Sequence, residues 1–65
     1  MLELYDKVRV KSSGTTGTII DISQISGRTS FIVESDREND PSPNVTYHTL
    51  WPLYDCTADE IEKSE

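Results

Sequence analysis

Cysteine and histidine each occur only once in this chain, so several kinds of chemistry lack the residues they need. Cys56 alone cannot form an internal disulfide, which fits a reducing compartment or indifference to redox state. One cysteine and one histidine, His48, are too few for a zinc site. Neither has sequence neighbours that would make it a nucleophile or a general base. We therefore expect no enzymatic activity, no metal and no cofactor.

Long apolar runs are also missing. No stretch approaches the roughly 20 apolar residues that a transmembrane helix needs. The first residues lack the basic segment and apolar run of a secretory signal peptide. We expect a cytoplasmic protein that does not contact a membrane.

Positive charge is scarce: six Lys and Arg residues stand against twelve Asp and Glu, for a net charge of −6. The excess of carboxylates lies in the second half, where residues 34–65 hold two cations and nine carboxylates. Such a charge repels phosphate backbones and favours solubility. The stretch from Ser35 to Asn44 reads as a solvated acidic loop, because it lacks the glycine of a calcium-binding loop and contains two prolines.

The first strand is the clearest structural signal. Val8 and Val10 alternate with Lys7, Arg9 and Lys11, which predicts a half-buried strand over residues 5–11 with the cations outward. Runs rich in β-branched and aromatic residues predict three more strands. They cover residues 18–23, 30–34 and 45–49, and the turns between the first three are Ser12–Gly17 and Ser26–Thr29.

Residues 50–54 are apolar but interrupted by Pro52, so we expect an irregular segment packed on the core. In the second strand Ile20 and Ile22 are expected to face inward, with Ile19 outward or at a β-bulge. The expected core consists of Leu4, Val8, Val10, Ile20, Ile22, Phe31, Val33, Val45, Leu50, Leu53 and Ile61.

The C-terminal tail leaves two alternatives open. Thr57 and Glu60 have the spacing of a capping box, which predicts a single helical turn. A short fifth strand around Ile61 is the competing interpretation, and residues from about 60 to 65 are expected to fray.

Several short strands with turn residues between them favour a single all-β domain, a small five-stranded barrel over residues 1–65. The pattern Gly14-x-x-Gly17-x-Ile19-x-x-Ile22, preceded by Val8-x-Val10, resembles the KOW motif, the opening hairpin of SH3-like barrels in ribosomal proteins and transcription elongation factors. With Tyr5-Asp6 and Asp59-Glu60-Ile61-Glu62, the chain also looks like small uncharacterised bacterial proteins of SH3-like fold. The resemblance implies an SH3-like barrel, a fold that serves many unrelated activities.

Two surfaces are candidates for function. Tyr47, Trp51 and Tyr54 are aromatic residues near Pro52 that would form a protein-binding platform if exposed. The competing interpretation, which a chain this short favours, is that they cover the open end of the barrel. We therefore expect a non-catalytic interaction module that binds another protein or forms a homo-oligomer. The alternative is a KOW-like module that contacts RNA or DNA through Lys7, Arg9 and Lys11, which the net charge disfavours.

Overall fold

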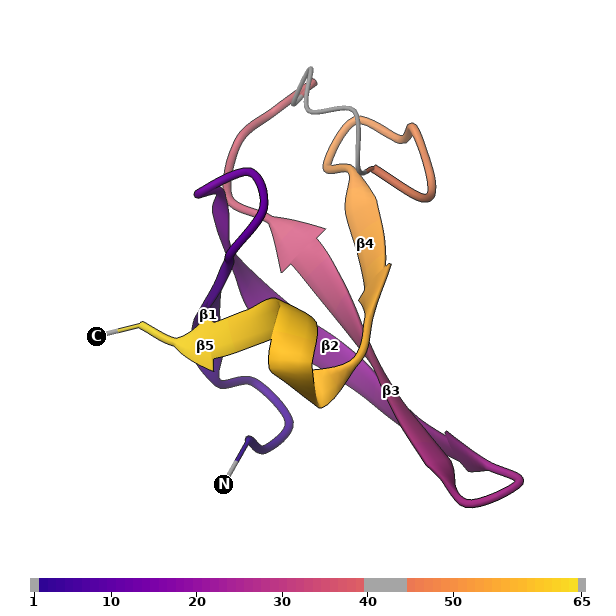
Figure 1. Ribbon diagram of the computed structural model, residues 1–65. Helices are drawn as coiled ribbons and strands as arrows, with labels where there is room; N and C mark the ends of the chain where they lie inside the picture. Colours follow the sequence, from indigo (N-terminus) through magenta and orange to yellow (C-terminus); the bar gives the residue numbers. More distant parts are fainter. Residues whose placement is uncertain (1, 40–44, 65) are drawn as a thin grey trace.

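The computed structural model describes residues 2–39 and 45–64, in which five strands form one antiparallel sheet (Figure 1). The strands are β1 (Lys7–Val10), β2 (Thr16–Ile25), β3 (Arg28–Ser35), β4 (Leu53–Cys56) and β5 (Ile61–Lys63). Their order is β4-β3-β2-β1-β5, so the last strand returns to lie beside the first. The expected all-β class is confirmed. No ladder between described residues joins the two edge strands, β4 and β5, so the sheet is open.

The β2–β3 hairpin is longer than the rest of the sheet and projects beyond it, at the lower right of Figure 1. Its turn consists of Ser26 and Gly27, both with positive φ (53° and 76°), as a two-residue type I′ turn requires. Pairing of β1 with β2 ends where Lys7 lies opposite Thr18. The distal part of β2 therefore has only β3 as a neighbouring strand.

An extra residue in β2 decides which isoleucines enter the core. The pairing with β3 shifts by one residue between Ile19 and Asp21, so Ile20 has no partner and forms a β-bulge. A bulge was expected at Ile19, and the structure has it one residue later. The expected facing was wrong for Ile19, which is fully buried, and for Ile20, which is exposed. Ile22 lies opposite the core residue Phe31 and so has the expected facing, but it remains 38% exposed.

Gly17 lies within β2 rather than in the preceding turn, and it allows the backbones of β2 and β3 to approach closely. A Cβ atom at this position would lie 2.5 Å from the carbonyl oxygen of Glu34 and 2.7 Å from Cγ1 of Val33. Gly14, with φ of 74°, is the glycine that shapes the turn between β1 and β2.

Alternation within the strands builds one core cluster, which consists of Val8, Val10, Ile19, Phe31, Val33, Val45, Tyr54, Cys56 and Ile61. Ile19, Tyr54 and Cys56 were not expected there. Conversely, Leu4, Ile20, Ile22 and Leu50 were expected in the core and are exposed, while Leu53 is half-buried.

The fourth strand lies later in the chain than the sequence predicts. Residues 45–49 form a loop with one isolated bridge, between Tyr47 and Leu53, and the strand begins only after Pro52. Pro52 is buried, and its carbonyl oxygen accepts a hydrogen bond from the Ser35 amide at 2.8 Å. Since proline has no amide proton to donate to a ladder, regular pairing starts at the next residue.

Both interpretations of the C-terminal segment are realised in succession. A 3₁₀ turn, η1 (Ala58–Glu60), leads directly into β5. The Thr57 amide donates to the Glu60 carboxylate at 2.8 Å, and the Thr57 hydroxyl donates to Asp59 at 2.5 Å, which lowers the pKa of Asp59. Residues 61–63 were expected to fray but pair with β1, because burial of Ile61 in the core anchors them.

Candidate interaction surface

The loop of residues 46–51, at the upper right of Figure 1, carries large apolar side chains into solvent. Tyr47, Leu50 and Trp51 expose 52%, 55% and 45% of their surface. Two of them, Tyr47 and Trp51, are among the aromatic residues that the sequence indicated for binding. Leu50 was missed as a surface residue because its apolar character placed it in the expected core.

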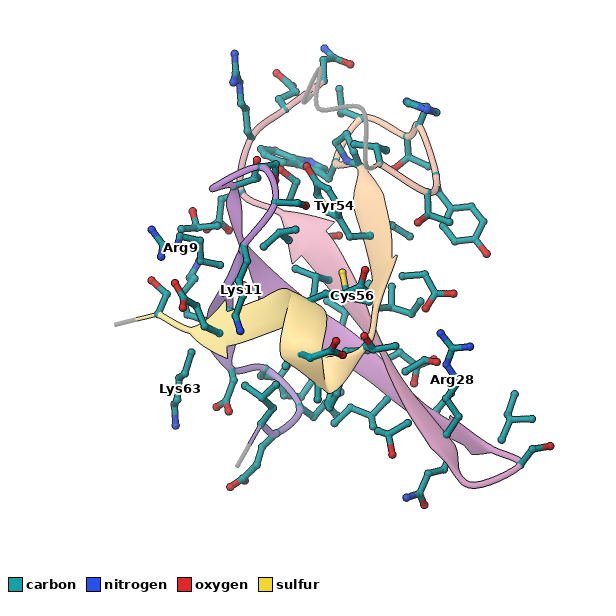
Figure 2. The ribbon with its side chains drawn as sticks, in the orientation of Figure 1. Arg9, Lys11, Arg28, Tyr54, Cys56 and Lys63 are labelled. Atoms are coloured by element: carbon teal, nitrogen blue, oxygen red, sulfur yellow. The ribbon has the colours of Figure 1, made fainter. Side chains whose placement is uncertain are left out.

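Tyr54, the third expected binding residue, belongs to the core and not to an exposed surface. It is 1% exposed and lies in β4 opposite Val33. Figure 2 shows it on the same side of β4 as Cys56, two residues further on. Because side chains alternate along a strand, the position that directs Cys56 into the core also directs Tyr54 there.

Backbone hydrogen bonds on both sides hold the 46–51 loop in place. Tyr47 and Leu53 exchange both of their backbone hydrogen bonds, at 3.1 and 3.0 Å. On the other side, the Asn39 amide donates to the Leu50 carbonyl oxygen at 2.9 Å. The exposed side chains are therefore presented by an ordered backbone, which reduces the entropy that a partner must remove on binding.

The cations of β1 lie on the solvent face of the sheet, as expected, but two of them are already paired with carboxylates. Lys7 Nζ lies 2.7 Å from Asp36, and Arg9 forms an ion pair with Glu62 of β5. Lys11 makes no ion pair with a described residue (Figure 2). These pairs lower the positive potential of the strand that the nucleic-acid hypothesis requires.

Cys56 and His48 lie in environments that do not activate them. Burial raises the pKa of the Cys56 thiol to about 11, and the charges of Glu60 and Asp55 act in the same direction. The thiol is therefore protonated at neutral pH, the unreactive form. His48 is exposed in the 46–51 loop. In residues 2–39 and 45–64, no three His, Cys, Asp or Glu side chains are close enough together to hold a metal ion.

Open depressions on the described surface are further candidates for a binding site. A polar one of about 390 Å³, beside the β1–β2 turn, is lined by Ser13, Gly14, Thr15, Thr16, Asp36 and Arg37. A more apolar groove of about 530 Å³, at the base of the projecting hairpin, is lined by Leu2, Ile22, Gln24, Thr29, Phe31 and Ala58. The sequence did not indicate this groove, although it did place Ile22 and Phe31 on the same face of the sheet.

Comparison of the chain with protein families, curated proteins and solved structures finds no match in any of the three. Within the described residues, no helix has the length and apolar character needed to cross a bilayer. Arguments about function therefore depend on the chain's own surface.

Proposed function

We propose that this chain is a non-catalytic interaction module with an SH3-like barrel fold, and that it binds another protein through the 46–51 loop. The observation that carries the proposal is the exposure of Tyr47, Leu50 and Trp51 on a loop whose backbone is hydrogen-bonded on both sides. Exposed large apolar side chains on an ordered backbone are typical of protein-binding sites, where aromatic anchors supply most of the affinity.

The barrel part of the proposal is supported by the two edges of the sheet. Tyr54 and Cys56 come from β4 at one edge and Ile61 comes from β5 at the other, yet all three belong to the same core cluster. The sheet must therefore curve around that core. The bulge at Ile20 in the long central strand β2 is the kind of feature that bends a strand at a barrel corner.

The test is a selection from a phage-displayed random peptide library on the immobilised full chain. A selected peptide, synthesised and titrated, is expected to lose at least about tenfold in affinity when Leu50 and Trp51 are both replaced by serine, since buried apolar anchors contribute over 1 kcal/mol each. Ile25→Ser, which removes an exposed isoleucine from the tip of the β2–β3 hairpin, is the matched control and is expected to bind normally.

Peptides that bind wild type and the Leu50→Ser/Trp51→Ser variant equally well would contradict the assignment to this loop. Failure to select any peptide that distinguishes the two proteins would do the same. Far-UV circular dichroism of each variant shows whether a loss of binding comes from loss of fold.

Nucleic-acid binding through Lys7, Arg9 and Lys11 is the alternative, and it is the weaker proposal because Lys7 and Arg9 already have carboxylate partners. A gel-shift titration at low salt tests it directly. A shift that is lost in Lys11→Gln would favour it over the protein-binding proposal, because only a nucleic acid requires that cation.

A further inference from the structure

The outer edge of β2 has backbone groups that no other strand uses. Ile25 lies opposite Arg28 across a two-residue turn, so Ile25 and Ser23 direct their backbone groups toward β3, whereas Ile22 and Gln24 direct theirs away from it. On this side β1 pairs only as far as Thr18, and the last backbone bond runs from the Tyr5 amide to the Ile19 carbonyl oxygen, at 2.7 Å.

This edge lacks the features that usually prevent strands from pairing. Natural edge strands carry lysine, proline or inward-pointing charges. From Ile20 to Ser26 the only charged residue is Asp21, and there is no proline. The Asp21 carboxylate turns back to accept a hydrogen bond from the Ile22 amide, at 3.0 Å.

We propose that this edge pairs with the same edge of a second copy of the chain, in an antiparallel, two-fold symmetric ladder centred on Ser23. Only residues that direct their backbone outward can exchange hydrogen bonds across such a ladder. With Ser23 on the axis, Ile22 of each copy lies opposite Gln24 of the other, so the outward-facing residues of both copies meet. The register is self-complementary, as an isologous interface requires.

Side chains on both faces of the paired edges fit this register. Ile22 and Gln24 lie on the face that carries the apolar groove, so Ile22 of each copy is brought beside the groove of the other. On the opposite face, Asp21 of one copy lies across from Ile25 of the other. Within the second copy, Ile25 of β2 pairs with Arg28 of β3. Arg28 of the second copy therefore lies two strands away from Asp21 of the first, on the same face and with the opposite charge.

The net charge of the chain predicts how the association constant of the dimer depends on salt concentration. Two copies with a net charge of −6 repel one another at long range, whereas the edge itself is nearly uncharged. Raising ionic strength screens the repulsion without weakening backbone hydrogen bonds. Self-association is therefore expected to strengthen between low and moderate salt, the reverse of binding driven by attraction between opposite charges.

The test is sedimentation equilibrium of the full chain from micromolar to millimolar concentration, with Gln24→Pro as the main variant. Gln24 directs its amide away from β3, so proline there leaves the β2–β3 ladder intact and removes one donor from each copy. The association constant is expected to fall at least about tenfold. Lys63→Pro is the matched control, because Lys63 lies in the edge strand β5, away from the β2–β3 hairpin, and directs its amide away from β1; it should associate as wild type does.

Asp21→Ala supplies a variant whose effect cannot come from misfolding. It frees the Ile22 amide and removes the only charge on the edge, so association should strengthen about threefold or more. A wild-type chain that stays monomeric at millimolar concentration overturns the proposal. So does a dimer that Gln24→Pro and Lys63→Pro weaken equally, or a dimer that Leu50→Ser/Trp51→Ser weakens. The Leu50→Ser/Trp51→Ser variant tests the protein-binding proposal, which does not depend on whether the chain forms this dimer.

Discussion

Titration of the buried thiol should make this protein lose stability in alkaline solution. The folded state holds the pKa of Cys56 at about 11, against an ordinary value of 9.0. Above pH 9 the unfolded chain releases this proton while the folded chain still keeps it, so rising pH favours unfolding. The contribution is fully present below pH 9 and is lost as the pH rises through 11.

The size of the loss follows from the same two pKa values. Each pKa unit is worth about 1.4 kcal/mol, so the folded state stands to lose about 3 kcal/mol between pH 9 and 11. A domain of this length has a free energy of unfolding of about 3–10 kcal/mol. The alkaline loss is therefore large enough to move the midpoint of a urea unfolding curve clearly.

Urea denaturation followed by the fluorescence of Trp51, the only tryptophan, measures the effect between pH 7 and 11. Cys56→Ala is the control: it has no thiol to titrate, so the amount by which it is less stable than wild type should shrink above pH 9. All other residues are the same in both proteins, so their contributions cancel in that difference. A difference that stays constant to pH 11 would refute the reasoning, since it would mean that the thiol is not desolvated in the folded state.

Three further predictions concern the glycines, the β-bulge and a surface ion pair. Gly17→Ala should destabilise by about 1–3 kcal/mol in urea unfolding, because its Cβ would overlap the β3 backbone, and an unchanged stability would contradict the close-approach argument. Gly27→Ala, which has open space but positive φ, should cost about 1–2 kcal/mol from backbone strain alone. Ile19→Ala should cost about 2–5 kcal/mol and Ile20→Ala under about 1 kcal/mol, and the reverse order would place the bulge elsewhere. Lys7→Gln should change the free energy of unfolding by less than about 1 kcal/mol, since its ion pair is solvent-exposed; a larger loss would give that pair a structural role.

Strict alternation made β1 and β3 predictable from the sequence. Val8 and Val10, like Phe31 and Val33, stand two residues apart in strands without a bulge, and all four are in the core as expected. Period-two reasoning works where each residue of a strand faces one residue of its neighbour.

The same reasoning fails in β2, where the sequence offers three apolar residues within four positions. Ile19, Ile20 and Ile22 cannot all follow one alternation, and a bulge between two of them reverses the facing of everything beyond it. Which residue is extra is set by the pairing with β3, in which Ile19 lies opposite Val33 and Asp21 lies opposite Ile32. That choice depends on contacts between strands, which no local pattern shows.

The aromatic residues near Pro52 show a similar division. In the sequence, Tyr47, Trp51 and Tyr54 were equivalent candidates for a binding surface. The residue at which β4 begins decides which of the three side chains face solvent. Once pairing begins after Pro52, Tyr54 shares its face with Cys56 and enters the core, while the preceding loop keeps Tyr47 and Trp51 outside. A tyrosine two residues before a buried cysteine was the available signal, and it required knowing that residues 53–56 are a strand.

The two proposed contact regions lie at different ends of the molecule, and this arrangement lets them work together. The 46–51 loop is at the top of Figure 1, and the free edge of β2 is on the hairpin that projects at the lower right. Two copies joined at their hairpins would each keep their loop exposed, so the dimer would present two protein-binding loops. Binding to a partner with two matching sites would then gain from effective concentration. Gln24→Pro should weaken binding to such a partner while leaving binding to a single-site peptide unchanged, whereas Leu50→Ser/Trp51→Ser should weaken both. If Gln24→Pro also weakened binding to the single-site peptide, the two regions would not be independent.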